Sequence, residues 1–150
     1  MTAQSDPREP GPLAILVLDD DLKWRQLIAF NVELHLGISP VLVSNGKEAL
    51  KVMAERHFDV VLSDLFMPVM DGFEFLQRVR ALYPRTKVIM LSGDFLAFPV
   101  SPERLIQHGA LATVPKAEFR QLFKISCAIC WTPTDRFAPL FMSESSDSAI

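Results

Sequence analysis

Short apolar runs alternate with segments of helical spacing along most of this chain, and this alternation restricts the possible folds more than any other feature. Residues 13–18 read as a strand buried on both faces, and the helical pattern that follows stops at Gly37. Further strands are expected at residues 41–43, 58–64, 87–93 and 111–115, with helices at 45–57, 71–83, 101–109 and 117–131. Strands that alternate with helices predict an α/β fold, in which right-handed crossovers place helices on both faces of a parallel sheet.

Polar and charged residues stand at the ends of these predicted strands. The first strand runs directly into a triple of carboxylates that begins with Asp19 and Asp20, and the third strand ends at Asp64. Ser92 ends the fourth strand, and Lys116 follows the fifth. A buried carboxylate costs several kcal/mol unless it is paired or binds a metal. Because parallel strands end at one edge of the sheet, where ligands bind, the clustering predicts carboxylates that share a cation.

Length and composition suggest one ordinary globular domain. The chain has 150 residues, of which 49% are hydrophobic and 22% charged. We expect a flexible tail at residues 1–12, a domain at 13–131 and a partly disordered tail at 132–150. The net charge of −3 argues against a nucleic-acid surface, and no apolar run is long enough for a membrane span or a signal peptide. A cytoplasmic location is therefore expected.

The two cysteines, Cys127 and Cys130, form a C-x-x-C motif late in the last helical pattern. Redox motifs of this kind usually open a helix, and structural zinc needs four ligands. No second pair exists in the sequence, so we interpret both as buried thiols. The histidines, of which His57 is one, have no acids in pairing register and are interpreted as surface or helix-end residues.

The set of motifs resembles the receiver domain of bacterial two-component response regulators. The resemblance rests on the acidic pair, on SDLFMPVMDG with Asp64, on MLSG with Ser92, on HGA at residues 108–110 and on Lys116. Each motif is weak alone, but their order and spacing together are specific. The resemblance covers residues 13–131 and implies the flavodoxin-like strand order 2-1-3-4-5. Because the tail after residue 131 is too short to form an output domain, we expect a stand-alone receiver.

The resemblance also implies the chemistry. A histidine kinase or phosphotransfer protein would donate a phosphoryl group to Asp64, with Mg²⁺ as the cofactor. Asp20 would be a direct Mg²⁺ ligand and Asp19 a direct or water-mediated one. Asp64 and the backbone carbonyl of Phe66 would complete the protein ligands.

Two further residues would connect the phosphate to the rest of the molecule. Lys116 would pair with Asp64 or with the phosphate, and Ser92 would rotate to hydrogen-bond the phosphate. The resulting change would switch a surface that binds a downstream protein of unknown identity, without nucleic acid or membrane.

The sequence departs from the family pattern near the fifth strand. The usual lysine–proline pair is reversed here as Pro115 and Lys116, so a cis bond after the lysine cannot form. Thr113 stands where many relatives have a switching aromatic residue. Two aromatic residues, Phe95 and Phe98, precede a short fourth helix, and they either pack beneath it or form part of the output surface.

Several interpretations remain open beside this one. Asp21 fits an N-cap of the first helix better than a metal ligand. One alternative function is a receiver-like interaction module that works without phosphorylation. Another is a phosphatase with an aspartate nucleophile, since Asp19 and Asp21 have D-x-D spacing, but this leaves Asp64 unexplained.

Overall fold

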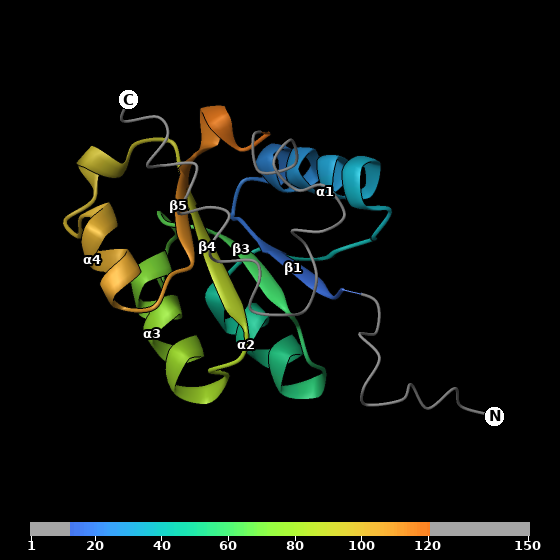
Figure 1. Cartoon of the computed structure of the whole chain (residues 1–150), viewed down its shortest axis with the longest axis horizontal. Helices are drawn as coiled ribbons and strands as arrows, with labels where there is room; N and C mark the ends of the chain where they lie inside the picture. Colours follow the sequence, from blue (N-terminus) through green and yellow to red (C-terminus); the bar gives the residue numbers. More distant parts are fainter. Residues whose placement is uncertain (1–12, 121–150) are drawn as a thin grey trace.

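The computed structural model describes residues 13–120, and a parallel sheet of five strands lies at its centre (Figure 1). The strands are β1 (Ile15–Leu18), β2 (Val41–Val43), β3 (Val60–Asp64), β4 (Lys87–Ser92) and β5 (Ala112–Pro115). Their order is β2-β1-β3-β4-β5, and every neighbouring pair is parallel. The predicted fold class and strand order are confirmed.

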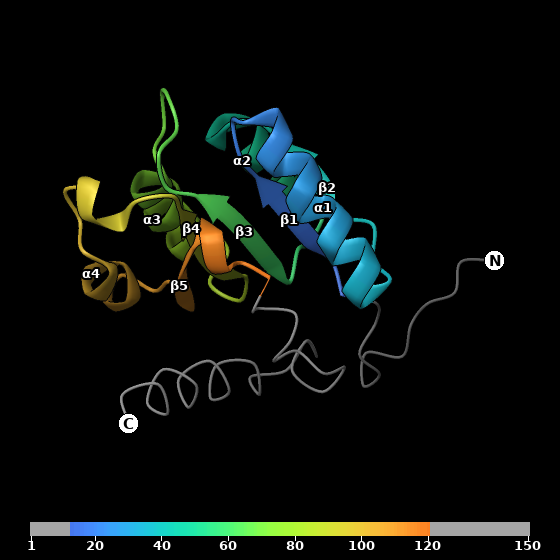
Figure 2. The same ribbon diagram turned by 90° about the horizontal axis from the view of Figure 1, so that it is seen from above.

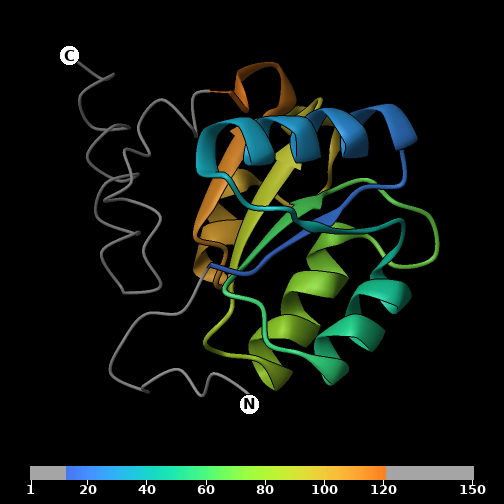
Figure 3. The same cartoon turned by 90° about the vertical axis from the view of Figure 1, so that its right-hand side faces the viewer.

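Helices cover both faces of the sheet, as Figure 3 shows. One face carries α1 (Leu22–Leu36), and the other carries α2 (Gly46–Glu55) and α3 (Gly72–Leu82). The short α4 (Pro102–Gln107) packs on the second face, because its Leu105 belongs to the same apolar cluster as the buried side of α3. Two 3₁₀ turns, η1 (Phe95–Ala97) and η2 (Lys116–Glu118), flank α4 and β5.

Two apolar clusters, one on each side of the sheet, explain the uninterrupted apolar strands. Along β1, Ile15 and Val17 join the cluster beneath α1, while Leu16 and Leu18 join the cluster beneath α2 and α3. Successive side chains of a strand point to opposite faces, so a strand covered on both sides must be apolar at every position. The apolar run therefore predicts burial between two helical layers.

The helix ends follow the capping residues expected from the sequence. The Asp21 carboxylate accepts a hydrogen bond from the Lys23 N–H at 2.9 Å, which confirms it as the N-cap of α1. That helix ends at Gly37, whose φ of 67° lies in the left-handed region that glycine favours. Ser101 caps α4, which begins at Pro102.

Some expectations differ from the structure or fall outside it. The predicted helix at residues 117–131 begins within η2, and most of it lies outside the described residues, as do Cys127, Cys130 and both expected tails. The prediction that His57 has no acidic partner is wrong. Its Nε2 lies 3.1 Å from Asp59 Oδ1, and the two residues are only two positions apart in the segment between α2 and β3.

Gly72, the first residue of α3, packs directly against the chain that carries Asp64. A Cβ atom at this position would lie 2.6 Å from the Asp64 carbonyl oxygen and 2.8 Å from Leu65 Cα. We expect Gly72→Ala to lower the free energy of unfolding by about 1–3 kcal/mol through overpacking, although alanine is the better helix former. Urea denaturation would measure the change.

Gly93→Ala is the matched control for this substitution, because nothing lies within 4 Å of a Cβ atom built there. It should change the stability by no more than about 0.5 kcal/mol. A Gly72→Ala variant as stable as the wild type would show that the contact between α3 and the end of β3 is looser than described.

Candidate functional site

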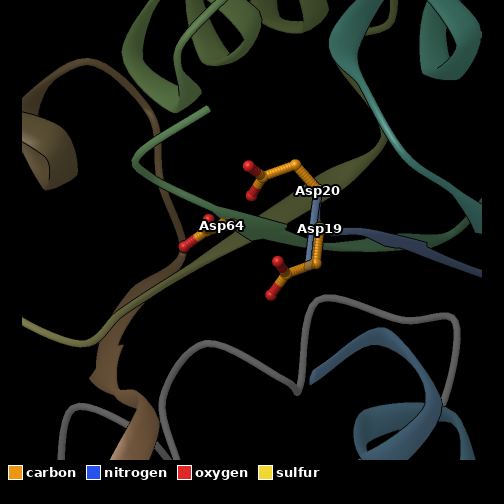
Figure 4. Close-up of side chains that lie close together, drawn as sticks. All are labelled: Asp19, Asp20 and Asp64. Carbon is orange, nitrogen blue, oxygen red and sulfur yellow. The ribbon is translucent and has the colours of Figure 1, made fainter. Parts of the chain in front are cut away.

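Three carboxylates gather at the carboxyl ends of two neighbouring strands (Figure 4). Asp19 and Asp20 directly follow β1, and Asp64 is the last residue of β3. One oxygen from each carboxylate lies within 4.8 Å of the others. Asp19 and Asp64 are buried and Asp20 is exposed, so the group has an inner wall and a side open to solvent.

Lys116 closes the inner side of this group. Its Nζ lies 2.8 Å from Asp19 Oδ2 and 3.2 Å from Asp64 Oδ1, and its side chain is 10% exposed. The strand register makes this possible, since β5 runs alongside β4, and β4 pairs with β3. The residues predicted at the ends of the first, third and fifth strands therefore do meet, with one buried ammonium between two buried carboxylates.

The charges of this group alter its proton affinities. Burial, and next the charge of Asp19, raise the pKa of Asp64 from 3.8 to about 7, against the opposing effect of Lys116. Burial lowers the pKa of Lys116, but its hydrogen bond to Asp19 and the charges of both carboxylates outweigh burial, so this pKa is raised overall. One ammonium therefore does not fully compensate for the negative charge of the site.

The turn after β1 is fixed by its own hydrogen bonds. Asp19 Oδ1 accepts from the Asp21 N–H at 2.9 Å, and Arg25 Nη1 donates to the Asp19 carbonyl oxygen at 2.7 Å. This contact of Arg25 was not predicted, because a hydrogen bond from the first turn of α1 to the end of β1 cannot be recognised from the spacing of residues in the sequence. With Asp21 used as a helix cap, Asp19 and Asp20 are the members of the triple that face Asp64.

The two remaining predicted residues are Ser92 and Phe66. Ser92 is fully buried, and its hydroxyl accepts a hydrogen bond from the Asp94 N–H at 3.1 Å. Phe66 is 43% exposed, and its ring contacts the Phe98 ring edge-on at a centroid distance of 4.9 Å. Phe98 is buried in the core, which favours the packing interpretation of this residue, whereas the neighbouring Leu96 is 95% exposed.

The open side offers room beside Asp20. A hollow of about 500 Å³ lies there, lined by residues 44–47 at the start of α2 and residues 68–70 of the loop after β3. Figure 2 shows this loop rising beyond the carboxyl end of β3. Carboxylate oxygens at this spacing suit a hard divalent cation such as Mg²⁺, which keeps several waters and needs few protein ligands.

The match to a known family agrees with this geometry. A family model described as the response regulator receiver domain matches residues 15–125. The chain belongs to this family. It is a receiver domain of two-component systems with an acidic pocket formed by Asp19, Asp20 and Asp64.

Individual relatives are similar over the same region. The chain is 36% identical over 80 residues to the autoinducer 1 sensor kinase/phosphatase LuxN of Vibrio campbellii, which covers 53% of this chain and 9% of LuxN. It is 35% identical over 105 residues to a protein-glutamate methylesterase/protein-glutamine glutaminase of Hahella chejuensis, covering 69% of this chain and 30% of that protein. The receiver thus spans a small part of both curated relatives.

A solved structure gives the same fold. The receiver domain of the histidine kinase CKI1 from Arabidopsis thaliana, a complex with Mg²⁺, superposes with a TM-score of 0.60 and 29% identity. The match covers 73% of this chain and 86% of that one.

Among the described residues, no helix is both long and apolar enough to cross a membrane.

Proposed function

We propose that Asp64 accepts a phosphoryl group from the phosphohistidine of a histidine kinase or phosphotransfer protein. The observation that carries the proposal is the position of Asp64, which is buried at a strand end and contacts the Lys116 ammonium, which also contacts the Asp19 carboxylate. A carboxylate that Lys116 contacts at Oδ1 has its second oxygen available as the nucleophile. That oxygen forms a bond to phosphorus, the P–N bond breaks, and the histidine ring leaves with a proton.

The proposed cofactor is Mg²⁺, held by Asp19, Asp20, Asp64 and the backbone carbonyl of Phe66. The three carboxylates have the spacing and the excess negative charge that such an ion requires. Bound there, Mg²⁺ would neutralise phosphate oxygens during the transfer. Lys116 supplies the second positive charge from the buried side and keeps the acceptor oxygen oriented.

We further propose that phosphorylation switches a protein-binding surface, within a receiver that extends over residues 13–131. Ser92 would exchange its contact with the Asp94 N–H for one with a phosphate oxygen. The segment from Asp94 to Phe98 would change with it, because Asp94 caps η1 and Phe98 packs on Phe66. A ligand shifts such an equilibrium only through contacts that differ between the two states.

Incubation with acetyl phosphate and Mg²⁺ tests the acceptor. The wild-type intact mass should rise by one phosphoryl group, and Asp64→Asn should remain unmodified, because an amide oxygen is too weak a nucleophile. Asp21→Asn is the matched control, since asparagine caps a helix as well as aspartate does. It should be labelled like the wild type. Equal labelling of Asp64→Asn would overturn the assignment, and no labelling of any variant would favour an interaction module that works without phosphorylation.

A further inference from the structure

Lys116 has three neighbours at its charged end, and only two of them are carboxylates. Its Nζ lies 2.8 Å from Asp19 Oδ2 and 3.2 Å from Asp64 Oδ1. The third neighbour is the indole of Trp24, over which the ammonium lies at 5.1 Å from the ring centroid. The aromatic face attracts the cation and also excludes water from the side that no carboxylate covers.

The indole is itself held in place. Trp24 lies in the first turn of α1, and its ring meets the Phe119 ring edge-on at a centroid distance of 5.8 Å. Phe119 is 3% exposed, and its N–H donates to the Lys116 carbonyl oxygen. The three residues thus form one assembly, in which α1 supplies the aromatic face and the turn after β5 supplies the lysine and the supporting ring.

Backbone geometry does not provide this restraint. Pro115 precedes the lysine, and residues 13–120 contain no cis peptide bond. Because lysine has a flexible stem with a rotatable ammonium, side-chain contacts must fix its position. Asp19 and Asp64 attract the ammonium, but they leave it free to swing towards solvent on its third side.

We propose that Trp24 is a positioning residue for Lys116 and holds its ammonium against Asp19 and Asp64 through a cation–π contact. The proposal rests on the proposed function in one respect: it predicts that the rate of phosphoryl transfer to Asp64 depends on Trp24. Trp24 does not contact the acceptor, and its effect passes through the lysine.

The first test compares substitutions at Trp24. Trp24→Leu removes the aromatic face and keeps an apolar side chain, whereas Trp24→Phe keeps a smaller aromatic face. With acetyl phosphate and Mg²⁺, Trp24→Leu should be phosphorylated about fivefold to tenfold more slowly at saturating donor, and Trp24→Phe within about twofold of the wild type. Phe30→Leu, at an exposed position of the same helix, is the matched control and should keep the wild-type rate.

The second test needs no phosphorylation. In a carbon–proton NMR correlation spectrum of the wild type, the Lys116 Cε protons should lie upfield of ordinary lysine signals because of the indole ring current. The shift should vanish in Trp24→Leu and persist in part in Trp24→Phe. A Lys116 signal at ordinary lysine values in the wild type overturns the proposal, even if Trp24→Leu does not fold.

The two tests separate the two proposals. Unlabelled wild type with an upfield Lys116 signal would contradict the acceptor role of Asp64 and leave the contact with Trp24 in place. Labelled wild type, together with an unchanged rate in Trp24→Leu, would contradict the positioning role and leave the acceptor in place. A rate that falls equally in Trp24→Leu and Phe30→Leu would also overturn it, because a general effect on α1 would then be sufficient.

Discussion

Replacing Asp64 with asparagine is expected to increase the free energy of unfolding by about 4 kcal/mol at about pH 8, and by almost nothing near pH 4, in a buffer without divalent cations. Asp64 is 5% exposed, and the substitution keeps the shape of its side chain. The ionised Asp64 carboxylate should therefore lower the free energy of unfolding of the protein.

The sign follows from the proton affinity of Asp64. Burial and the charge of Asp19 raise its pKa from 3.8 to about 7 in the folded protein. At pH values below the pKa of Asp64 in the unfolded chain, Asp64 is protonated in both the folded and the unfolded state, and its burial does not lower the stability. As the pH rises from about 4 to about 7, only the unfolded state loses its proton, so stability falls by about 1.4 kcal/mol for each pH unit. Above the folded pKa the penalty is constant, and asparagine removes it.

Urea denaturation at a series of pH values would measure this effect, with the wild type and Asp64→Asn compared at each pH. Asp21→Asn is the matched control, because Asp21 is an exposed helix cap, and its substitution should change stability by no more than about 0.5 kcal/mol. If the difference between wild type and Asp64→Asn does not grow between about pH 4 and about pH 8, Asp64 is ionised in the fold at little cost. Addition of Mg²⁺ should reduce the difference, because the cation favours the ionised form.

The layered α/β architecture and the helix caps could be predicted because their signals are local or repeat along the chain, whereas the strand order followed only from the resemblance to receiver domains. Apolar residues at every position of β1 reflect burial on both sheet faces, and Asp21, Gly37 and Ser101 mark helix ends by their own chemistry. The convergence of Asp19, Asp64 and Lys116 also follows, because parallel strands bring their carboxyl ends to one edge. Their individual roles in phosphoryl transfer remain predictions.

Contacts between residues distant in sequence could not be predicted in this way. Two examples are the contact of Trp24 with Lys116 and the contact of Phe66 with Phe98. Both contacts depend on how helices and loops pack, which the residue types alone do not indicate. Val69 is a further example. It is 84% exposed at a φ of 72°, a conformation that a β-branched residue adopts only when the surrounding loop imposes it.

Replacing Lys116 with methionine is expected to have the largest destabilising effect at this site. Methionine has a similar length and no charge, so the Asp19 and Asp64 carboxylates would remain buried without the ammonium that lies 2.8 Å and 3.2 Å from them. Removal of one member of a buried ion pair costs about 3–5 kcal/mol, mostly because the remaining charge is uncompensated. Lys51→Met, at an exposed position of α2, should cost no more than about 0.5 kcal/mol.

A double-mutant cycle identifies the cause of that cost. If the remaining charges are responsible, Asp64→Asn should recover a large part of the stability lost in Lys116→Met, because one of the two uncompensated carboxylates is then neutral. The cost should also shrink as the pH falls from about pH 8 to about pH 5, because protonation then neutralises Asp64, whose pKa is raised to about 7. Urea denaturation of the four proteins at both pH values would give the coupling energy. A loss that is independent of pH and of Asp64 would instead assign the effect to lost packing around the lysine stem, and the ammonium would then contribute to phosphoryl transfer without holding the folded site together.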